Sequence, residues 1–140
     1  MHLKVLSIRK ALGNIEDRER ADALQVELAS LNGLCTFGKD FLLHYLGFQE
    51  LSFDDDDVLH TVIVSDYIHG DSFGSWNGRI QPFLNRLIVM NQLASALSFM
   101  HEGGYCHNDL SPNNFIVIDD QHGNVSTVLI DFGSTRPPGV

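Results

Sequence analysis

The sequence lacks the features of a disulfide-linked secreted protein and of a membrane protein. Its two cysteines, Cys35 and Cys106, lie far apart with no metal-ligand spacing around them. Two free thiols in a reducing compartment are the favoured interpretation, and a disulfide is the alternative. No run approaches the roughly 18 apolar residues of a membrane helix. Lys4, Arg9 and Lys10 break the N-terminal stretch where a signal peptide would be apolar. We therefore expect a soluble, cytoplasmic protein.

The chain also has few positive charges. Its 9 Lys and Arg face 18 Asp and Glu, which gives a net charge of −9. Nucleic-acid binders present a basic face, and anionic membrane surfaces attract basic segments. We therefore expect neither nucleic acid nor a membrane as the partner. Apolar residues are abundant, at 44% of 140 residues, which is enough for the core of one domain.

Apolar periodicity predicts strands and one helix in the first half of the chain. The expected strands cover residues 3–8, 41–48 and 58–64. A helix that Asn14 caps and Gly33 ends lies between the first two, because apolar residues recur there at helical spacing. The acidic run at residues 54–57 favours a solvated turn, with a cation site as the alternative.

The second half predicts a long helix followed by a β-hairpin. Turn-forming residues make 70–78 a loop-rich crossing. Pro82 then opens a helix that ends near Gly103. Two short strands follow, at residues 115–118 and 127–130. Strands with one helix, and then a helix with a hairpin, predict an α+β chain in two lobes.

Three polar residues of the second half suit phosphoryl transfer. That reaction needs hard oxygen ligands for Mg²⁺ and an acceptor held in line with the phosphate. Asp109 follows the long helix, Asn114 opens one strand of the hairpin and Asp131 ends the other. Strand pairing brings Asn114 and Asp131 to one end of the hairpin. Each residue alone is typical of a surface turn, whereas the three together, with their flanking residues in register, indicate a site.

The residues around these three resemble the catalytic loop of eukaryotic-type protein kinases. Residues 107–114 read HNDLSPNN where the family has H-R-D-L-x-x-x-N, and residues 131–133 read DFG. The resemblance also covers the helix before the loop, from residue 92. A lone DFG is a weak signal, and the two motifs in the correct order are a strong one.

The resemblance implies a partial protein-kinase-like bilobal fold for residues 1–140. Residues 1–65 would be a remnant of the small lobe, with strands and one helix. Residues 66–72 would be the hinge. Residues 73–140 would begin the large lobe, with the long helix, the catalytic loop and the β-hairpin.

The resemblance also implies a role for each residue of the loops. Asp109 would orient the substrate hydroxyl and accept its proton, while Asn114 and Asp131 would hold Mg²⁺ against the phosphates of ATP. Ser111 replaces a Lys that lies near the transferred phosphate in Ser/Thr kinases, so it supplies a hydrogen bond without a positive charge. Asn108 replaces the Arg that pairs with a phosphorylated activation loop, so we expect no phosphorylation switch through this residue.

Residues 61–72, TVIVSDYIHGDS, resemble the family's strand and hinge that contact adenine. The backbone of Asp66 and Ile68 would pair with the edge of the base. Ile116 would lie beneath the ring, and Asp71 would reach the ribose. The alternative is an ordinary buried strand that ends in a turn.

Residues 23–34 resemble the family's regulatory helix, with Glu27 as the partner of a phosphate-binding lysine. Lys4 matches the lysine of the family's V-A-I-K strand, although His2 replaces the small Ala. Lys10 is the alternative lysine. Without this context, Glu27 is typical of a solvated helix surface.

Parts of the family's domain have no counterpart here. The Gly-rich loop that covers the phosphates is missing before Lys4, and the A-P-E motif and substrate-binding helices are missing after Gly133. The chain is interpreted as a gene fragment, one exon of a longer product or a reduced relative.

The leading hypothesis for function is ATP- and Mg²⁺-dependent phosphoryl transfer to a Ser or Thr hydroxyl of a protein. One alternative is a catalytically inactive pseudokinase that binds nucleotide or a protein partner, which Ser111 favours. The other is a small-molecule kinase of the aminoglycoside or choline type, which Gly133 disfavours because those relatives usually lack it.

Overall fold

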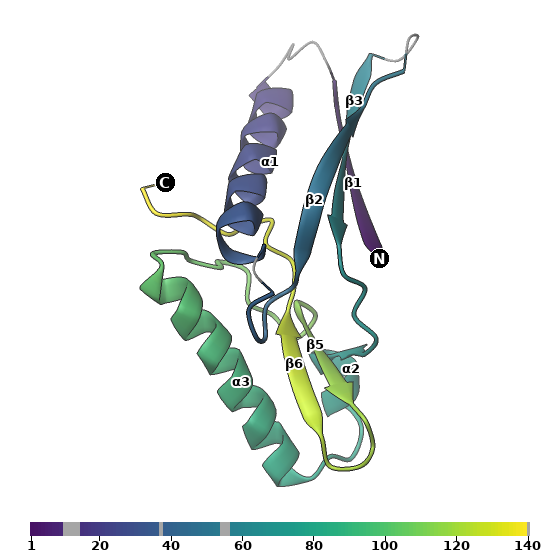
Figure 1. Cartoon of the computed structure of the whole chain (residues 1–140), viewed down its shortest axis with the longest axis vertical. Helices are drawn as coiled ribbons and strands as arrows, with labels where there is room; N and C mark the ends of the chain where they lie inside the picture. The colour runs from purple at the N-terminus through teal and green to yellow at the C-terminus, as the bar shows by residue number, and fades with distance from the viewer. Residues whose placement is uncertain (10–14, 37, 54–56, 140) are drawn as a thin grey trace.

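The computed structural model describes residues 1–9, 15–36, 38–53 and 57–139. It is a mixed α and β structure with antiparallel sheets (Figure 1), so the α+β class is confirmed at that level. The elements are β1 (His2–Arg9), α1 (Ile15–Leu34), β2 (Tyr45–Leu51), β3 (Val58–Ser65), β4 (Asp71–Ser72), α2 (Phe73–Asn77), α3 (Phe83–Glu102), β5 (Phe115–Asp119) and β6 (Val125–Leu129). No helix in these residues is both long enough and apolar enough to cross a bilayer.

The N-terminal sheet has the order β1-β3-β2, and α1 lies along one of its faces (Figure 1). Side chains alternate across a strand, so every second residue of β1 faces the helix. Lys4, Leu6 and Ile8 are half-buried on that side, whereas Leu3 and Val5 are exposed on the other. This alternation places a lysine side chain on the same face as the buried side chains of the central strand β3.

Helix α1 meets this sheet through an apolar face with helical spacing. Leu24, Leu28 and Leu31 are buried, three and four residues apart, as the sequence predicts. Asn14, the expected cap, lies outside the described residues. Gly33 lies inside the helix rather than just past its end, because the helix continues to Leu34.

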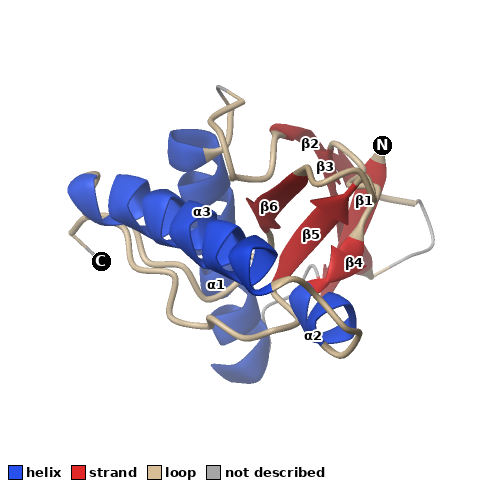
Figure 2. Ribbon diagram, turned by 90° about the horizontal axis from the view of Figure 1, so that it is seen from below, coloured by secondary structure: helices blue, strands red, loops and turns tan. Residues whose placement is uncertain are grey.

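The C-terminal sheet has the order β4-β5-β6, and α3 packs against β6 (Figure 2). The buried side of α3 consists of Val89, Leu93, Ala96 and Met100. In the hairpin, Phe115 pairs with Leu129, and Ile130 N donates to Asn114 O at 3.0 Å. The backbone of Asn114 is therefore held opposite Ile130, the residue before Asp131.

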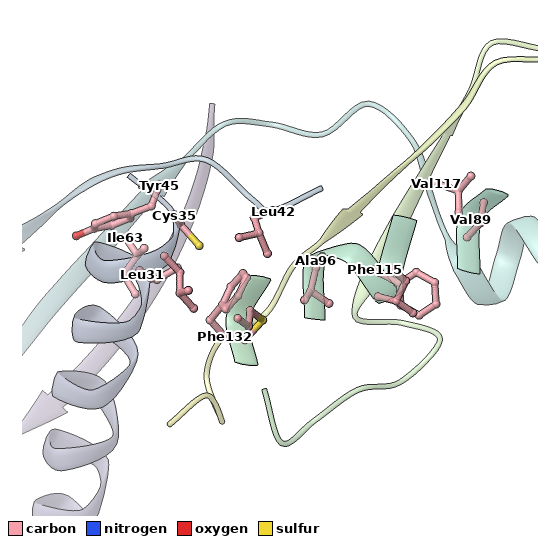
Figure 3. Close-up of a cluster of buried hydrophobic side chains, with 14 of the residues drawn as sticks. Leu31, Cys35, Leu42, Tyr45, Ile63, Val89, Ala96, Phe115, Val117 and Phe132 are labelled. Carbon is pink, nitrogen blue, oxygen red and sulfur yellow. The ribbon is translucent and has the colours of Figure 1, made fainter. Parts of the chain in front are cut away.

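One continuous apolar core joins the two sheets (Figure 3). Figure 3 shows Leu31 and Ile63 on one side, Phe115 and Val117 on the other, and Phe132 between them. Residues 41–43 add a second link, because Leu129 N donates to Phe41 O at 2.8 Å and Leu43 N donates to Leu129 O at 3.1 Å.

Three expected local features differ in the structure. The strand expected at 41–48 begins only at Tyr45, because a turn with positive φ at Phe41 diverts the preceding residues to β6. The expected loop at 70–78 contains β4 and the short helix α2, which Ser72 caps by accepting from Ser75 N at 3.3 Å. Pro82 is the N-cap of α3 rather than a residue of its first turn.

Candidate functional site

A cavity of about 410 Å³ lies between the two sheets. Its volume is in the range of pockets that hold small molecules and cofactors. Residues from β1, α1, β3, β5 and the segment after β6 line it. Six of the residues expected to bind nucleotide lie in this lining: Lys4, Glu27, Asp66, Ile68, Ile116 and Asp131. The fold thus brings together residues that are widely separated in the sequence.

An ion pair lies in the wall of the cavity. Lys4 Nζ donates to Glu27 Oε1 at 2.6 Å, with side-chain exposures of 39% and 8% respectively. Glu27 is buried on the apolar side of α1, so its interpretation as a solvated surface residue is wrong. Burying a carboxylate is costly unless it is paired, and Lys4 provides the pairing. Lys10, the alternative lysine, lies outside the described residues.

Asp131 reaches the same cavity from the end of the hairpin. Its backbone has a φ of 60°, and its Oδ1 accepts from Gly133 N at 3.2 Å. A Cβ added to Gly133 would lie 3.3 Å from Asp131 Oδ1 and 3.7 Å from Lys4 Nζ. Gly133 therefore lies within van der Waals distance of the ion pair. The Asp131 carboxylate and the Lys4–Glu27 pair consequently surround one small volume.

Phe132 and His107 hold the two loops together. Phe132 is 1% exposed, and its ring meets the His107 ring edge-on at a centroid distance of 5.6 Å. His107 Nδ1 accepts from Asp109 N at 3.3 Å when that nitrogen is unprotonated. A buried aromatic pair therefore fixes the loop that carries Asp109 against the loop that carries Asp131.

Asp109, Ser111 and Asn114 form a compact turn of their own. Asn114 Nδ2 donates to Asp109 O at 2.6 Å and to Asp109 Oδ2 at 3.2 Å, and Asn114 N donates to Ser111 O at 3.0 Å. None of the three lines the cavity that contains Asp131. The structure thus brings these three together beside the cavity, with the Asn114 backbone hydrogen-bonded to the residue before Asp131.

The described residues contain no cluster of three or more His, Cys, Asp or Glu side chains with metal-ligand geometry. Magnesium sites rarely need one, because Mg²⁺ keeps several waters and takes one or two carboxylates plus phosphate oxygens. Asp131 and Asn114 offer a carboxylate and an amide oxygen from neighbouring loops. These two residues fit such a site when phosphate supplies the remaining ligands.

Comparison with known proteins finds similarity to serine/threonine protein kinases. The chain is 34% identical over 83 residues to serine/threonine-protein kinase SBK2 of Homo sapiens, a match covering 57% of this chain and 23% of that protein. It is 31% identical over 94 residues to serine/threonine-protein kinase GL21140 of Drosophila persimilis, covering 65% of this chain and 12% of that protein. The chain is protein-kinase-like. It spans about a quarter or less of the length of these relatives, and no protein-family model matches it.

Several residues of the cavity were not identified from the sequence. Tyr45 and Leu43 line it because the chain turns back at residue 41, which no local motif signals. At the cavity edge, His44 Nδ1 lies 3.0 Å from Asp66 Oδ2, and Asp66 N donates to His44 O at 3.0 Å. Asp71, expected at the ribose, is absent from the cavity lining, and its Oδ2 accepts instead from Arg79 at 2.6 Å.

The two cysteines are free, and they differ in burial. Burial raises the pKa of the Cys35 thiol to about 12, while Cys106 is exposed. At pH 8 a thiol with this raised pKa is almost wholly protonated and is a poor nucleophile. We expect iodoacetamide to label Cys106 in the folded protein and Cys35 only after unfolding, as peptide mass spectrometry would measure. Rapid labelling of Cys35 without denaturant would contradict its burial.

Proposed function

We propose that this chain binds ATP with Mg²⁺ as part of a domain that transfers phosphate to a Ser or Thr hydroxyl of a protein. The observation that carries the proposal is the Lys4–Glu27 ion pair at 2.6 Å, beside Asp131 in a cavity between the sheets. A lysine whose carboxylate partner is buried has its ammonium group held in one place. An ammonium group in a fixed position can orient a bound phosphate group for reaction, in addition to attracting its negative charge.

Base binding is assigned to the apolar part of the cavity lining. Ile63 and Ile116 supply apolar surface from β3 and β5. The backbone of Asp66 and Ile68 is assigned to the edge of adenine, where one donor and one acceptor suffice to orient a flat ring. Ser65 is buried next to them, so a small side chain leaves room behind the base.

The acceptor side is assigned to the turn that contains Asp109. Mg²⁺ neutralises phosphate charge when it is bound, and Asn114 and Asp131 are the residues assigned to hold it. Asp109 orients the acceptor hydroxyl and takes its proton. Asn114 Nδ2 donates to Asp109 Oδ2 and so limits rotation of that carboxylate. Ser111 hydrogen-bonds a phosphate oxygen and supplies no positive charge.

A nucleotide-binding role without transfer is the second candidate. Ser111 favours it, because a hydroxyl stabilises transition-state charge less than the lysine that the family usually carries. This candidate shares the ATP site and differs in the fate of the γ-phosphate.

The binding site is tested by calorimetric titration of ATP with and without Mg²⁺. We expect the wild-type chain to bind Mg²⁺–ATP and Asp131→Asn to lose at least about tenfold in affinity, since a neutral amide is a weaker ligand for Mg²⁺. Asp40→Asn is the matched control, because Asp40 is an exposed carboxylate outside the cavity lining. Asp40→Asn should bind as the wild type does.

Three outcomes separate the hypotheses. Failure of the wild type to bind nucleotide overturns the proposed site. Equal losses in Asp131→Asn and Asp40→Asn would reveal a general charge effect rather than a metal ligand. Binding without transfer from [γ-³²P]ATP to a protein acceptor identifies the nucleotide-binding role.

A further inference from the structure

Asn108 has an unusual backbone conformation between His107 and Asp109. Its φ is 66°, in the left-handed region that most L residues avoid and that asparagine tolerates. Asn108 is not among the residues that line the cavity. Asparagine is therefore compatible with the left-handed backbone at position 108, and its side chain makes contacts outside the cavity.

The Asn108 amide bridges two segments of the chain. Its Nδ2 donates to Cys106 O and to Ser134 O, each at 3.3 Å. Next to it, Cys106 N donates to Arg136 O at 3.1 Å, and Arg136 N donates to Cys106 O at 2.9 Å. The segment before Asp109 is thus fastened to the segment after Gly133 by one side chain and a pair of backbone bonds.

Residues 134–136 are also hydrogen-bonded to helix α1. Thr135 is fully buried, and its carbonyl accepts from Ser30 Oγ at 3.4 Å. Thr135 N donates to Phe132 O at 3.1 Å, which closes the turn that follows Asp131. Asp131 itself has a φ of 60°, so its conformation depends on such surroundings.

We infer that Asn108 is a positioning residue: its neutral amide holds residues 131–136 against the loop of Asp109 and thereby fixes the Asp131 carboxylate without any phosphate group. The effect of Asn108 on Mg²⁺ binding rests on the proposed function, whereas its ordering of residues 131–136 does not.

Two substitutions isolate the Asn108 side chain. Asn108→Gly keeps the left-handed backbone accessible and removes the amide. Asn108→Asp keeps the size and replaces the donor with an acceptor that faces two carbonyl oxygens. Asn113→Asp is the control, because it makes the same chemical change at an exposed position of the same loop.

The first readout is hydrogen exchange of the Arg136 and Cys106 amides, measured without ligand. We expect both Asn108 variants to exchange at least about fivefold faster than wild type, and Asn113→Asp to match wild type. Unchanged exchange in Asn108→Gly and Asn108→Asp would overturn the inference. This result stands even where the wild type fails to bind nucleotide, an outcome that overturns the proposed function alone.

The second readout is the Mg²⁺ dependence of ATP binding. We expect the Asn108 variants to need at least about threefold more Mg²⁺ for half-maximal binding, while their affinity for ATP in EDTA stays that of the wild type. A general loss of structure would lower both affinities equally. Faster exchange with unchanged Mg²⁺ dependence would show that Asn108 orders the loop without positioning Asp131, and would overturn the positioning role.

Discussion

Replacing Phe132 with Ala is expected to lower the free energy of unfolding by about 3–5 kcal/mol, as for other buried aromatic residues. Phe132 is 1% exposed and lies at the centre of the core, between Leu31 of α1 and Ala96 of α3 (Figure 3). Truncation removes a large side chain from the apolar core that joins the two sheets and leaves a cavity there. Urea denaturation followed by circular dichroism measures the change.

Phe132→Leu is the control for this prediction. Leucine fills much of the same volume, so the expected loss is smaller, about 1 kcal/mol. The edge-on contact with the His107 ring is lost in both variants and contributes equally to each. A loss below about 1 kcal/mol for Phe132→Ala would mean that the ring is not packed as the structure has it.

Replacing Lys4 with Met is expected to cost about 1–3 kcal/mol of stability, because it leaves the Glu27 carboxylate buried without its cation. The larger losses typical of fully buried ion pairs are not expected here, because the Lys4 side chain is 39% exposed and water weakens the interaction. Methionine retains most of the apolar stem, so the loss reports on the charge. Chemical denaturation at neutral pH and low salt is the suitable measurement.

A double-mutant cycle shows whether this cost belongs to the pair. Glu27→Gln and Lys4→Met/Glu27→Gln complete the cycle, and the double variant should be more stable than the sum of the single losses predicts. A coupling free energy of at least about 0.5 kcal/mol is expected. Strict additivity would show that the 2.6 Å contact contributes nothing to the folded state.

Elements with a strong local pattern were predicted well from the sequence. The spacing of Leu24, Leu28 and Leu31 predicts the buried face of α1, and the structure confirms it. The strands of the hairpin were predicted to within two residues at each end. In both places the local pattern and the tertiary environment favour the same conformation, so local reasoning is sufficient.

Features that depend on distant contacts were not predicted. Helix α2 has five residues, too few for helical periodicity, and Trp76 stabilises it by burying its ring and donating from Nε1 to Asp119 Oδ2 at 2.9 Å. The turn at Phe41 exists because its backbone bonds to Leu129, 88 residues later in the chain. The positions of Tyr45 and Leu43 in the cavity lining follow from that turn, so no local sequence pattern indicates them.

The same backbone contact limits how the two sheets can move. Residues 66–70 form the linker between β3 and β4 and so connect the two sheets along the chain. The backbone hydrogen bonds of Leu129 with Phe41 and Leu43 connect the same two sheets at a second place. Any motion that widens the cavity would therefore be restrained by these backbone hydrogen bonds as well as by the linker and the shared apolar core.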